Sequence, residues 1–459
     1  MDDLADQHIY TAALFKQTRL YEIPVRNPVT SEIESKYAFL YDGGMLFNGE
    51  VIKSIRQHNP KTSGEEGNLD IQRGDPSAYK QALQRHLKDK PHLQLIFGYI
   101  LSGLVRQALH IQGRDLGETG AVMCITGDPG TGKTSTTKGL KESLFGVNGN
   151  MTANATAIKT GYTVRDSGIC PLLIDDTSVK KGSPEALVES LYHLSNGSSR
   201  STCFAQSEVV YAPVIQSREK SSSMTKQLKT IYRLDGFVYR VFEIEVSKGD
   251  LAESAEEADA IRALSTDFSG QAIEFIRVLL NEHINAPDKL LSEYMDMMKY
   301  VLAVKNSNVA YEEIEDRIAN RAAVILLTLK IAGEAYDLDI DQRGATIVLL
   351  DAVLRMKTAL NKLNPGKYLD TIMDFYEYSS KYPLIEQPLV KGVKMFNPSV
   401  NIGFVDDKME YLWIPYNLMG LVVEQDWASN KTVPASHLPM FTQPKQLKYN
   451  TLVDLKKND

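Results

Sequence analysis

The sequence predicts an α/β protein whose parallel sheet holds a phosphate-bearing ligand at the carboxyl ends of its strands. Two observations support this prediction. An apolar run at residues 122–126 leads into a glycine-rich turn at 127–135, and a second apolar run at 171–174 ends in Asp175 and Asp176. Strand and helix patterns then alternate to about residue 250, which is typical of a parallel sheet covered by helices.

The glycine-rich turn has the spacing GxxxxGK[ST] of a phosphate-binding loop. Its glycines allow positive φ and close approach of the backbone to a phosphate, and the following helix adds partial positive charge at its N-terminus. Lys133 is expected to reach the terminal phosphates and the Thr134 hydroxyl to bind Mg²⁺. The expected nucleotide-binding residues are Gly127, Asp128, Pro129, Gly130, Thr131, Gly132, Lys133, Thr134 and Ser135.

The two carboxylates of the second apolar run are the predicted catalytic acids. An apolar run that ends in acid is common by chance, but this one follows a phosphate loop by about forty residues. Asp175 is expected to hold Mg²⁺ through water, and Asp176 to polarise the attacking water as general base.

Two later strand patterns contribute one candidate residue each. The strand predicted at 209–217 has a polar end at Ser217, where a group that senses the γ-phosphate would lie. The strand predicted at 236–246 is interrupted by Arg240, and a charge within an apolar strand is costly without a partner. Arg240 either forms a buried ion pair or binds a phosphate of a neighbouring subunit, and we favour the second interpretation.

The remaining chain divides by pattern. A small hairpin is predicted at 37–47, with its turn at 42–44. The predicted domains are an N-terminal segment (1–75), the ATPase core (76–250), a helical domain (251–365) and a C-terminal module (366–459). Helices are predicted at 76–111 (two helices), 138–145, 155–161, 183–195, 267–280, 289–304, 310–336, 342–363 and 368–380, and a strand at 410–415.

Composition limits the class of protein. Hydrophobic residues (43%) and charged residues (24%) are in the range of globular domains, and 459 residues suffice for several domains. The net charge of −7 argues against a generally basic surface, although not against a local basic groove in the pore of an oligomer. Three scattered cysteines predict a reduced, cytoplasmic protein without structural disulfides or zinc. The most apolar helical stretch, 322–332, is too short to cross a membrane.

Several short motifs, taken in order, resemble one family. They resemble the AAA+ ATPases related to the MCM-like, self-loading replicative helicases of staphylococcal cassettes and pathogenicity islands, which are related to superfamily III viral helicases. The resemblance covers roughly residues 90 to 360. Its motifs lie at 154–157, 172–176, 192–200, 216–219 and 236–241, and at Arg321 shortly before 332–335.

This resemblance implies a hexameric ring that hydrolyses ATP with Mg²⁺ between subunits and moves on single-stranded or forked DNA. It implies that Ser217 is the first sensor and Arg321 the second. It also implies that Arg240 is the finger that reaches the neighbour's γ-phosphate, and that Arg200 faces the pore and touches DNA phosphates. A small winged-helix-like module is expected at the C-terminus.

The chain departs from the family at two site positions. The family usually has Asp-Glu where this chain has Asp175 and Asp176, and an aspartate reaches less far, which predicts slow hydrolysis. The family also usually has glycine at the position of Arg218.

The preferred function is an ATP-dependent DNA helicase or translocase in replication of a mobile element or phage. One alternative is a nucleotide-gated scaffold that recruits partners without unwinding DNA. A second is a defence or regulatory ATPase that senses foreign nucleic acid or protein, and a third is a remodeller of proteins.

Overall fold

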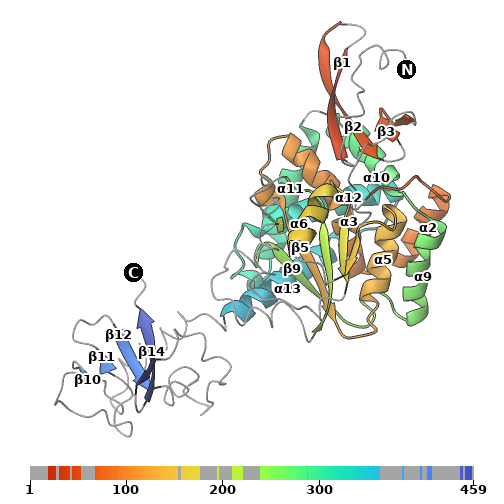
Figure 1. The fold of residues 1–459 in the computed structure, drawn as a ribbon. Coiled ribbons are helices and arrows are strands. Elements are labelled where there is room, and N and C mark those ends of the chain that lie inside the picture. Colours follow the sequence, from red (N-terminus) through yellow and green to blue (C-terminus); the bar gives the residue numbers. More distant parts are fainter. Residues whose placement is uncertain are drawn as a thin grey trace. The chain divides into compact units, whose positions relative to one another are not determined.

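Figure 1 shows the computed structural model of the chain. The chain divides into two compact units, residues 1–227 with 234–356, and residues 228–233 with 357–459. Each unit is described by itself. The structure describes residues 19–26, 30–41, 44–52, 68–152, 157–175, 194–195, 209–220, 238–286 and 288–361, and five short strands between 385 and 456.

The first unit is built on a five-stranded sheet with the order β6-β7-β8-β5-β9. Every neighbouring pair is parallel, as the sequence predicts. The central strand β5 is buried along its whole length, so it needs cover on both faces. The strands are β5 (Val122–Gly127), β6 (Asn150–Thr152), β7 (Leu172–Asp175), β8 (Val214–Glu219) and β9 (Val241–Val246).

Helix α3 (Pro91–Ile111) covers one face of the sheet. The Tyr99 hydroxyl donates to the carbonyl oxygens of Ala121 (2.9 Å) and Val214 (3.0 Å), which ties the helix to two strands. Helix α12 (Ile318–Tyr336) packs against α3. Gly98 allows this approach, because a Cβ there would lie 2.9 Å from the Cβ of Leu329.

Helix α5 (Lys133–Leu144) starts directly after the phosphate loop and packs against α9 (Ala255–Asp267). The predicted helix at 138–145 is therefore longer at its start. Helix α9 was not predicted, although its N-cap is visible in the sequence: the Ser254 hydroxyl accepts from the Glu257 N–H at 3.2 Å.

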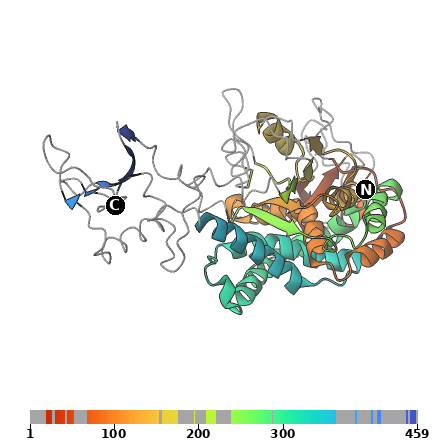
Figure 2. The same ribbon diagram turned by 90° about the horizontal axis from the view of Figure 1, so that it is seen from below.

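The other helices confirm most of the predicted pattern, and the blue-green ones gather on one side of the strands in Figure 2. The pair predicted at 76–111 is confirmed. Two stretches that were each predicted as one helix contain two elements. The 310–336 stretch is a 3₁₀ turn followed by α12, and the 267–280 stretch is α10 followed by a π-helical turn, η5. The helices are α2 (Pro76–Leu87), α4 (Leu116–Thr119), α6 (Ala157–Asp166), α10 (Ala272–Val278), η5 (Leu279–Ile284), α11 (Lys289–Asn306), η6 (Val309–Tyr311), α12 (Ile318–Tyr336) and α13 (Gln342–Asn361).

The N-terminal part of the first unit is a four-stranded antiparallel sheet. The predicted hairpin is confirmed, since Tyr41 pairs with Gly44 across the turn. Apolar side chains such as Ile23, Leu40 and Phe47 form a separate core for this sheet. The strands are β1 (Arg19–Arg26), β2 (Ile33–Tyr41), β3 (Gly44–Phe47) and β4 (Glu50–Ile52).

The described part of the second unit contains a mixed sheet with the order β10-β11-β12-β14-β13. The strand predicted at 410–415 is confirmed, whereas the helices predicted at 368–380 and 183–195 lie outside the described residues, apart from two helical residues at 194–195. No helix in the described ranges is long and apolar enough to cross a membrane. The strands are β10 (Ile385–Glu386), β11 (Phe404–Val405), β12 (Tyr411–Pro415), β13 (Lys445–Leu447) and β14 (Asn450–Lys456).

Candidate nucleotide-binding site

The phosphate loop connects β5 to α5 and uses its glycines in two ways. Gly130 and Gly132 both have φ of +81°, which L side chains rarely adopt. Gly127 has no positive φ; it is glycine because a Cβ there would overlap the carbonyl oxygen of Val246 on β9. The loop therefore has both the unusual backbone and the close packing that the motif predicts.

Lys133 folds back over its own loop. Its Nζ donates to the carbonyl oxygens of Gly127 (2.8 Å) and Asp128 (2.7 Å) and to the hydroxyl of Thr131 (3.2 Å). Burial lowers the pKa of Lys133, and the nearby carboxylates of Glu219 and Asp128 oppose that shift. The ammonium thus lies inside a ring of neutral oxygens that phosphate oxygens could replace.

Three oxygen-bearing side chains meet where three neighbouring strands end. The Thr134 hydroxyl donates to Asp175 Oδ1 at 2.9 Å and lies 3.1 Å from the Ser217 hydroxyl. Thr134 lies in the first turn of α5, Asp175 ends β7 and Ser217 lies on β8, so the parallel sheet brings together residues up to 83 positions apart. Hydroxyl and carboxylate oxygens are the ligands that Mg²⁺ prefers.

A cavity of roughly 480 Å³ opens over this cluster and the phosphate loop. Its lining includes Lys133, Thr134, Asp175 and Ser217, which the sequence predicted as site residues. It also includes side chains that sequence reasoning missed, among them Glu219 at the end of β8 and, from α9, Ala255, Ala258 and Asp259. Glu219 lies in the motif at 216–219 but was given no role, and no motif marks the α9 residues, because α9 reaches the cavity by packing on α5.

Strand β8 extends two residues further than predicted. The sequence suggested an end at Ser217, but Arg218 and Glu219 pair with Thr126 and Gly127 of β5. Arg218 tolerates this position because it has a polar partner: its guanidinium is 1% exposed and donates to the side-chain oxygen of Gln216 (2.8 and 3.2 Å). Where the family usually has glycine, this chain therefore has an arginine that makes a buried polar contact within the sheet.

The donor groups of this site suit the predicted ATP and Mg²⁺. The loop offers an ammonium, glycine backbone and a helix N-terminus for phosphates. For a metal ion, the Thr134 hydroxyl lies within 3.1 Å of both an Asp175 and a Ser217 oxygen. The residues fit both groups. The predicted base Asp176 and the predicted DNA contact Arg200 lie outside the described residues.

Arg240 does not interrupt a strand, as the sequence suggested, because β9 begins one residue later at Val241. Its carbonyl oxygen accepts from the N–H of Val122 at 2.8 Å, at the amino ends of β9 and β5. The phosphate loop follows the opposite end of β5. Six residues of strand, about 20 Å at roughly 3.3 Å per residue, therefore separate Arg240 from the loop.

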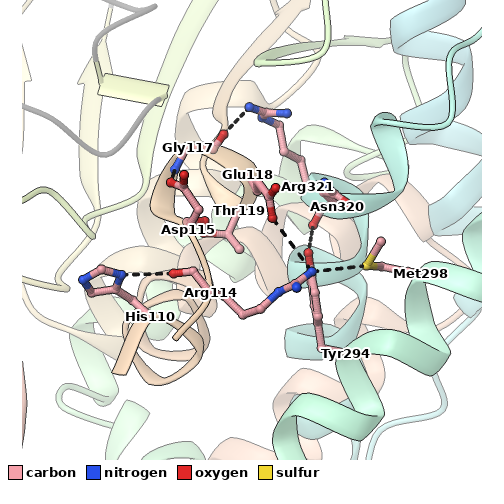
Figure 3. Close-up of polar contacts among 10 residues, drawn as sticks. All are labelled: His110, Arg114, Asp115, Gly117, Glu118, Thr119, Tyr294, Met298, Asn320 and Arg321. Carbon is pink, nitrogen blue, oxygen red and sulfur yellow. Dashed lines mark hydrogen bonds and ion pairs between the residues drawn. The ribbon is translucent and has the colours of Figure 1, made fainter. Parts of the chain in front are cut away.

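Arg321 also lies at this amino edge of the sheet and does not line the cavity. Figure 3 shows its side chain above the α4 turn, beside Tyr294 and Asn320. The guanidinium donates to the carbonyl oxygen of Gly120 at 2.7 Å and to that of Gly117. Burial lowers the pKa of Arg321 to about 10, and the positive charges of Arg240, Arg106 and Arg317 act in the same direction.

The same close-up shows how α4 is held from its other side. Arg114 lies over the ring of Tyr294, 4.9 Å from its centre, and 3.9 Å from a carboxylate oxygen of Glu118. The Tyr294 hydroxyl donates to the Asn320 carbonyl oxygen at 3.1 Å. These contacts link α11 and α12 to the segment that leads into β5.

The fold and the site define the class of protein: an α/β protein with a parallel sheet flanked by helices and a phosphate-binding loop. A solved structure described as "SCCmec type IV Cch - active helicase" has a similar fold, with a TM-score of 0.58 and 18% sequence identity. The match covers 96% of this chain and 79% of that chain. The predicted resemblance is therefore confirmed at the level of the fold. No family model matches the chain, and no curated protein matches its sequence.

Proposed function

We propose that this chain is an ATPase that acts as an ATP-dependent DNA helicase or translocase in replication of a mobile element or phage. Its cofactors are ATP and Mg²⁺, and its partners are single-stranded or forked DNA and further copies of itself in a ring, six by analogy. The helicase described in the similar structure supports this choice of activity.

The observation that carries the proposal is the meeting of Thr134, Asp175 and Ser217 beside the buried Lys133. When bound there, Mg²⁺ supplies positive charge that stabilises the developing charge on the phosphates. Lys133 would exchange its loop oxygens for phosphate oxygens, and Thr134 and Asp175 would hold the metal ion. Ser217 would sense the γ-phosphate, and Asp176 would accept a proton from the attacking water.

The arginines at the amino edge of the sheet support a site shared between subunits. Arg240 is about 20 Å of strand away from its own phosphate loop, so it cannot complete that site. In a ring it would reach the neighbour's γ-phosphate. Arg321 lies at the same edge, so any action of Arg321 as a second sensor would also be on the neighbour's nucleotide.

The nucleotide-gated scaffold is the second candidate. Asp176 is one methylene shorter than the glutamate usual at this position, and the net charge of −7 does not favour DNA over a protein partner. In a nucleotide-gated scaffold, ATP binding would close the ring, and the closed ring would recruit partners with little hydrolysis of ATP. The defence ATPase and the protein remodeller keep the same nucleotide site and differ in what stimulates it.

Hydrolysis is tested with Lys133→Ala in the full chain. We expect this change to lower ATP turnover at least about 100-fold, because it removes the charge that contacts the terminal phosphates. Lys138→Ala is the matched control, since Lys138 lies on the same helix and forms an ion pair with Glu142 at 3.6 Å. Steady-state phosphate release is the measurement. Turnover that survives in Lys133→Ala contradicts the proposed site.

Strand displacement on a forked DNA duplex separates helicase from scaffold. The helicase proposal predicts ATP-dependent displacement and stimulation of hydrolysis by single-stranded DNA. ATP-dependent assembly without displacement favours the scaffold. Stimulation by unfolded protein rather than by DNA favours the remodeller.

A further inference from the structure

His283 lies in the π-helical turn η5 and does not line the nucleotide cavity, and π-helical turns are frequent at functional sites. Its ring is buried, with its side chain 1% exposed, yet both ring nitrogens face carboxylates from other helices. Nδ1 lies 2.6 Å from Glu293 Oε2 on α11, and Nε2 lies 3.1 Å from Glu334 Oε2 on α12. Each ring nitrogen therefore has a carboxylate oxygen within 3.1 Å.

Glu293 has the role of an orienting partner. Its Oε2 faces His283, and its Oε1 accepts from Lys330 Nζ at 3.2 Å, so both oxygens are occupied. When the Glu293 carboxylate accepts the Nδ1–H, the Nε2 lone pair is directed at Glu334. Metal-bound histidines are usually oriented by a carboxylate in this way.

Glu282 adds a second carboxylate to His283 and Glu334. One ligand atom from each of Glu282, His283 and Glu334 lies within 4.8 Å of the other two. The 3.1 Å between His283 Nε2 and Glu334 Oε2 is close to the roughly 3.3 Å expected between two ligands of one tetrahedral zinc ion. Both glutamates are exposed, so an ion could enter from solvent and their side chains could turn toward it.

The charges of these side chains favour a divalent ion. With a neutral histidine ring, the carboxylates of Glu282, Glu293 and Glu334 and the ammonium of Lys330 leave two negative charges. A divalent cation neutralises both, whereas a second proton on the ring neutralises one.

We propose that Glu282, His283 and Glu334 bind a divalent transition-metal ion, for which zinc is the best match, with water completing the coordination. One imidazole and two carboxylates are ligand types that zinc accepts in proteins. The ion would join η5 to α12 directly and to α11 through Glu293. The absence of paired cysteines in the sequence argued against zinc, but that argument covers cysteine ligands only.

The test uses the full chain without nucleotide, stripped with a chelator and then exchanged into chelator-free buffer. It is titrated with Co²⁺, followed by visible absorption, and with Zn²⁺, followed by calorimetry. We expect one high-affinity ion per chain, displacement of Co²⁺ by Zn²⁺, and a higher melting temperature with Zn²⁺ present.

The variants Glu282→Gln and Glu334→Gln change exposed side chains, so both should fold, and each should weaken Zn²⁺ binding at least about tenfold. Glu293→Gln should weaken it about 10- to 100-fold, by loss of orientation rather than of a ligand. Asp175→Asn controls for metal bound at the nucleotide site, and Glu312→Gln controls for loss of an exposed glutamate on the same helical part. Both controls should keep the wild-type affinity.

Two outcomes overturn the proposal. One is a wild-type chain that binds neither Co²⁺ nor Zn²⁺ at the micromolar concentrations of the titration. The other is binding that is unchanged in Glu334→Gln. In either case His283 is a protonated ring shared by two glutamates, and the cluster is an ion-pair network.

Discussion

Arg321 shows how one residue can have a structural task where the family resemblance implies a catalytic one. Its guanidinium is buried and donates hydrogen bonds to the carbonyl oxygens of Gly117 and Gly120. The positive charges of three other arginines add to the cost of its own charge. These contacts fix the segment that precedes β5, and the phosphate loop follows β5. Arg321 therefore affects the position of the loop indirectly, by fixing the start of β5.

We expect Arg321→Gln to lower the free energy of unfolding by about 2–4 kcal/mol, because two hydrogen bonds from a charged donor to buried carbonyls are lost. The measurement is chemical denaturation, with Arg317→Gln as control, since Arg317 is a more exposed arginine one turn earlier on the chain. Full stability together with lost ATP turnover would show that Arg321 acts on nucleotide alone.

At the scale of elements, α5 and α9 are the pair that frames the cavity. Helix α5 carries Lys133 and Thr134, and α9 contributes Ala255, Ala258 and Asp259 to the lining. Their contact depends on Gly139, where a Cβ would overlap the carbonyl oxygen of Ile261 and press on the backbone of Arg262. Backbone atoms on a packed helix cannot move aside as a flexible side chain can, so this glycine fixes the distance between the two helices.

Gly139→Ala is expected to destabilise the chain by about 1–3 kcal/mol through overpacking. Gly161→Ala is the matched control, since Gly161 lies in helix α6 and a Cβ there meets nothing within 4 Å. That change should be neutral or should stabilise by about 0.5–1 kcal/mol, because alanine favours a helix over glycine. Equal stability of the two variants would contradict the packing of α5 on α9.

At the scale of the whole molecule, the parallel sheet separates two sets of charged groups. The phosphate loop, Asp175 and Ser217 lie toward the carboxyl ends of the strands, and Arg240 and Arg321 lie at the amino ends. One chain cannot bring these sets together across about 20 Å of strand. A second copy can, if its amino edge faces the first chain's cavity.

A mixing experiment tests this arrangement. Lys133→Ala retains Arg240, and Arg240→Ala retains the phosphate loop, so each variant alone should hydrolyse ATP poorly. Mixed in equal amounts, they should recover a measurable part of wild-type turnover, because some interfaces combine an intact loop with an intact Arg240. A mixture no more active than its separate components contradicts a shared site. Sedimentation with and without ATP shows whether the variants assemble.

The sequence predicted those parts of the site that depend on neighbouring residues. Gly130, Gly132, Lys133 and Thr134 follow from one motif, because a turn and the start of a helix are local structures. Asp175 was also predictable, since an apolar run followed by an acid marks the carboxyl end of a parallel strand. The hairpin at 37–47 and the helices at 76–111 followed from turn residues and apolar periodicity.

Only the tertiary structure decided which distant residues meet and which do not. In the structure, Glu219 and α9 line the cavity. Arg240 lies just before β9, at the amino edge of the sheet, and Arg321 donates to the segment that contains α4 and precedes β5. The structure also joins His283 to Glu334, 51 positions away. Sheet order and helix packing depend on contacts between distant segments, and no local pattern in this chain records them. The sequence therefore determined the chemistry of the phosphate loop, and the fold determined its surroundings.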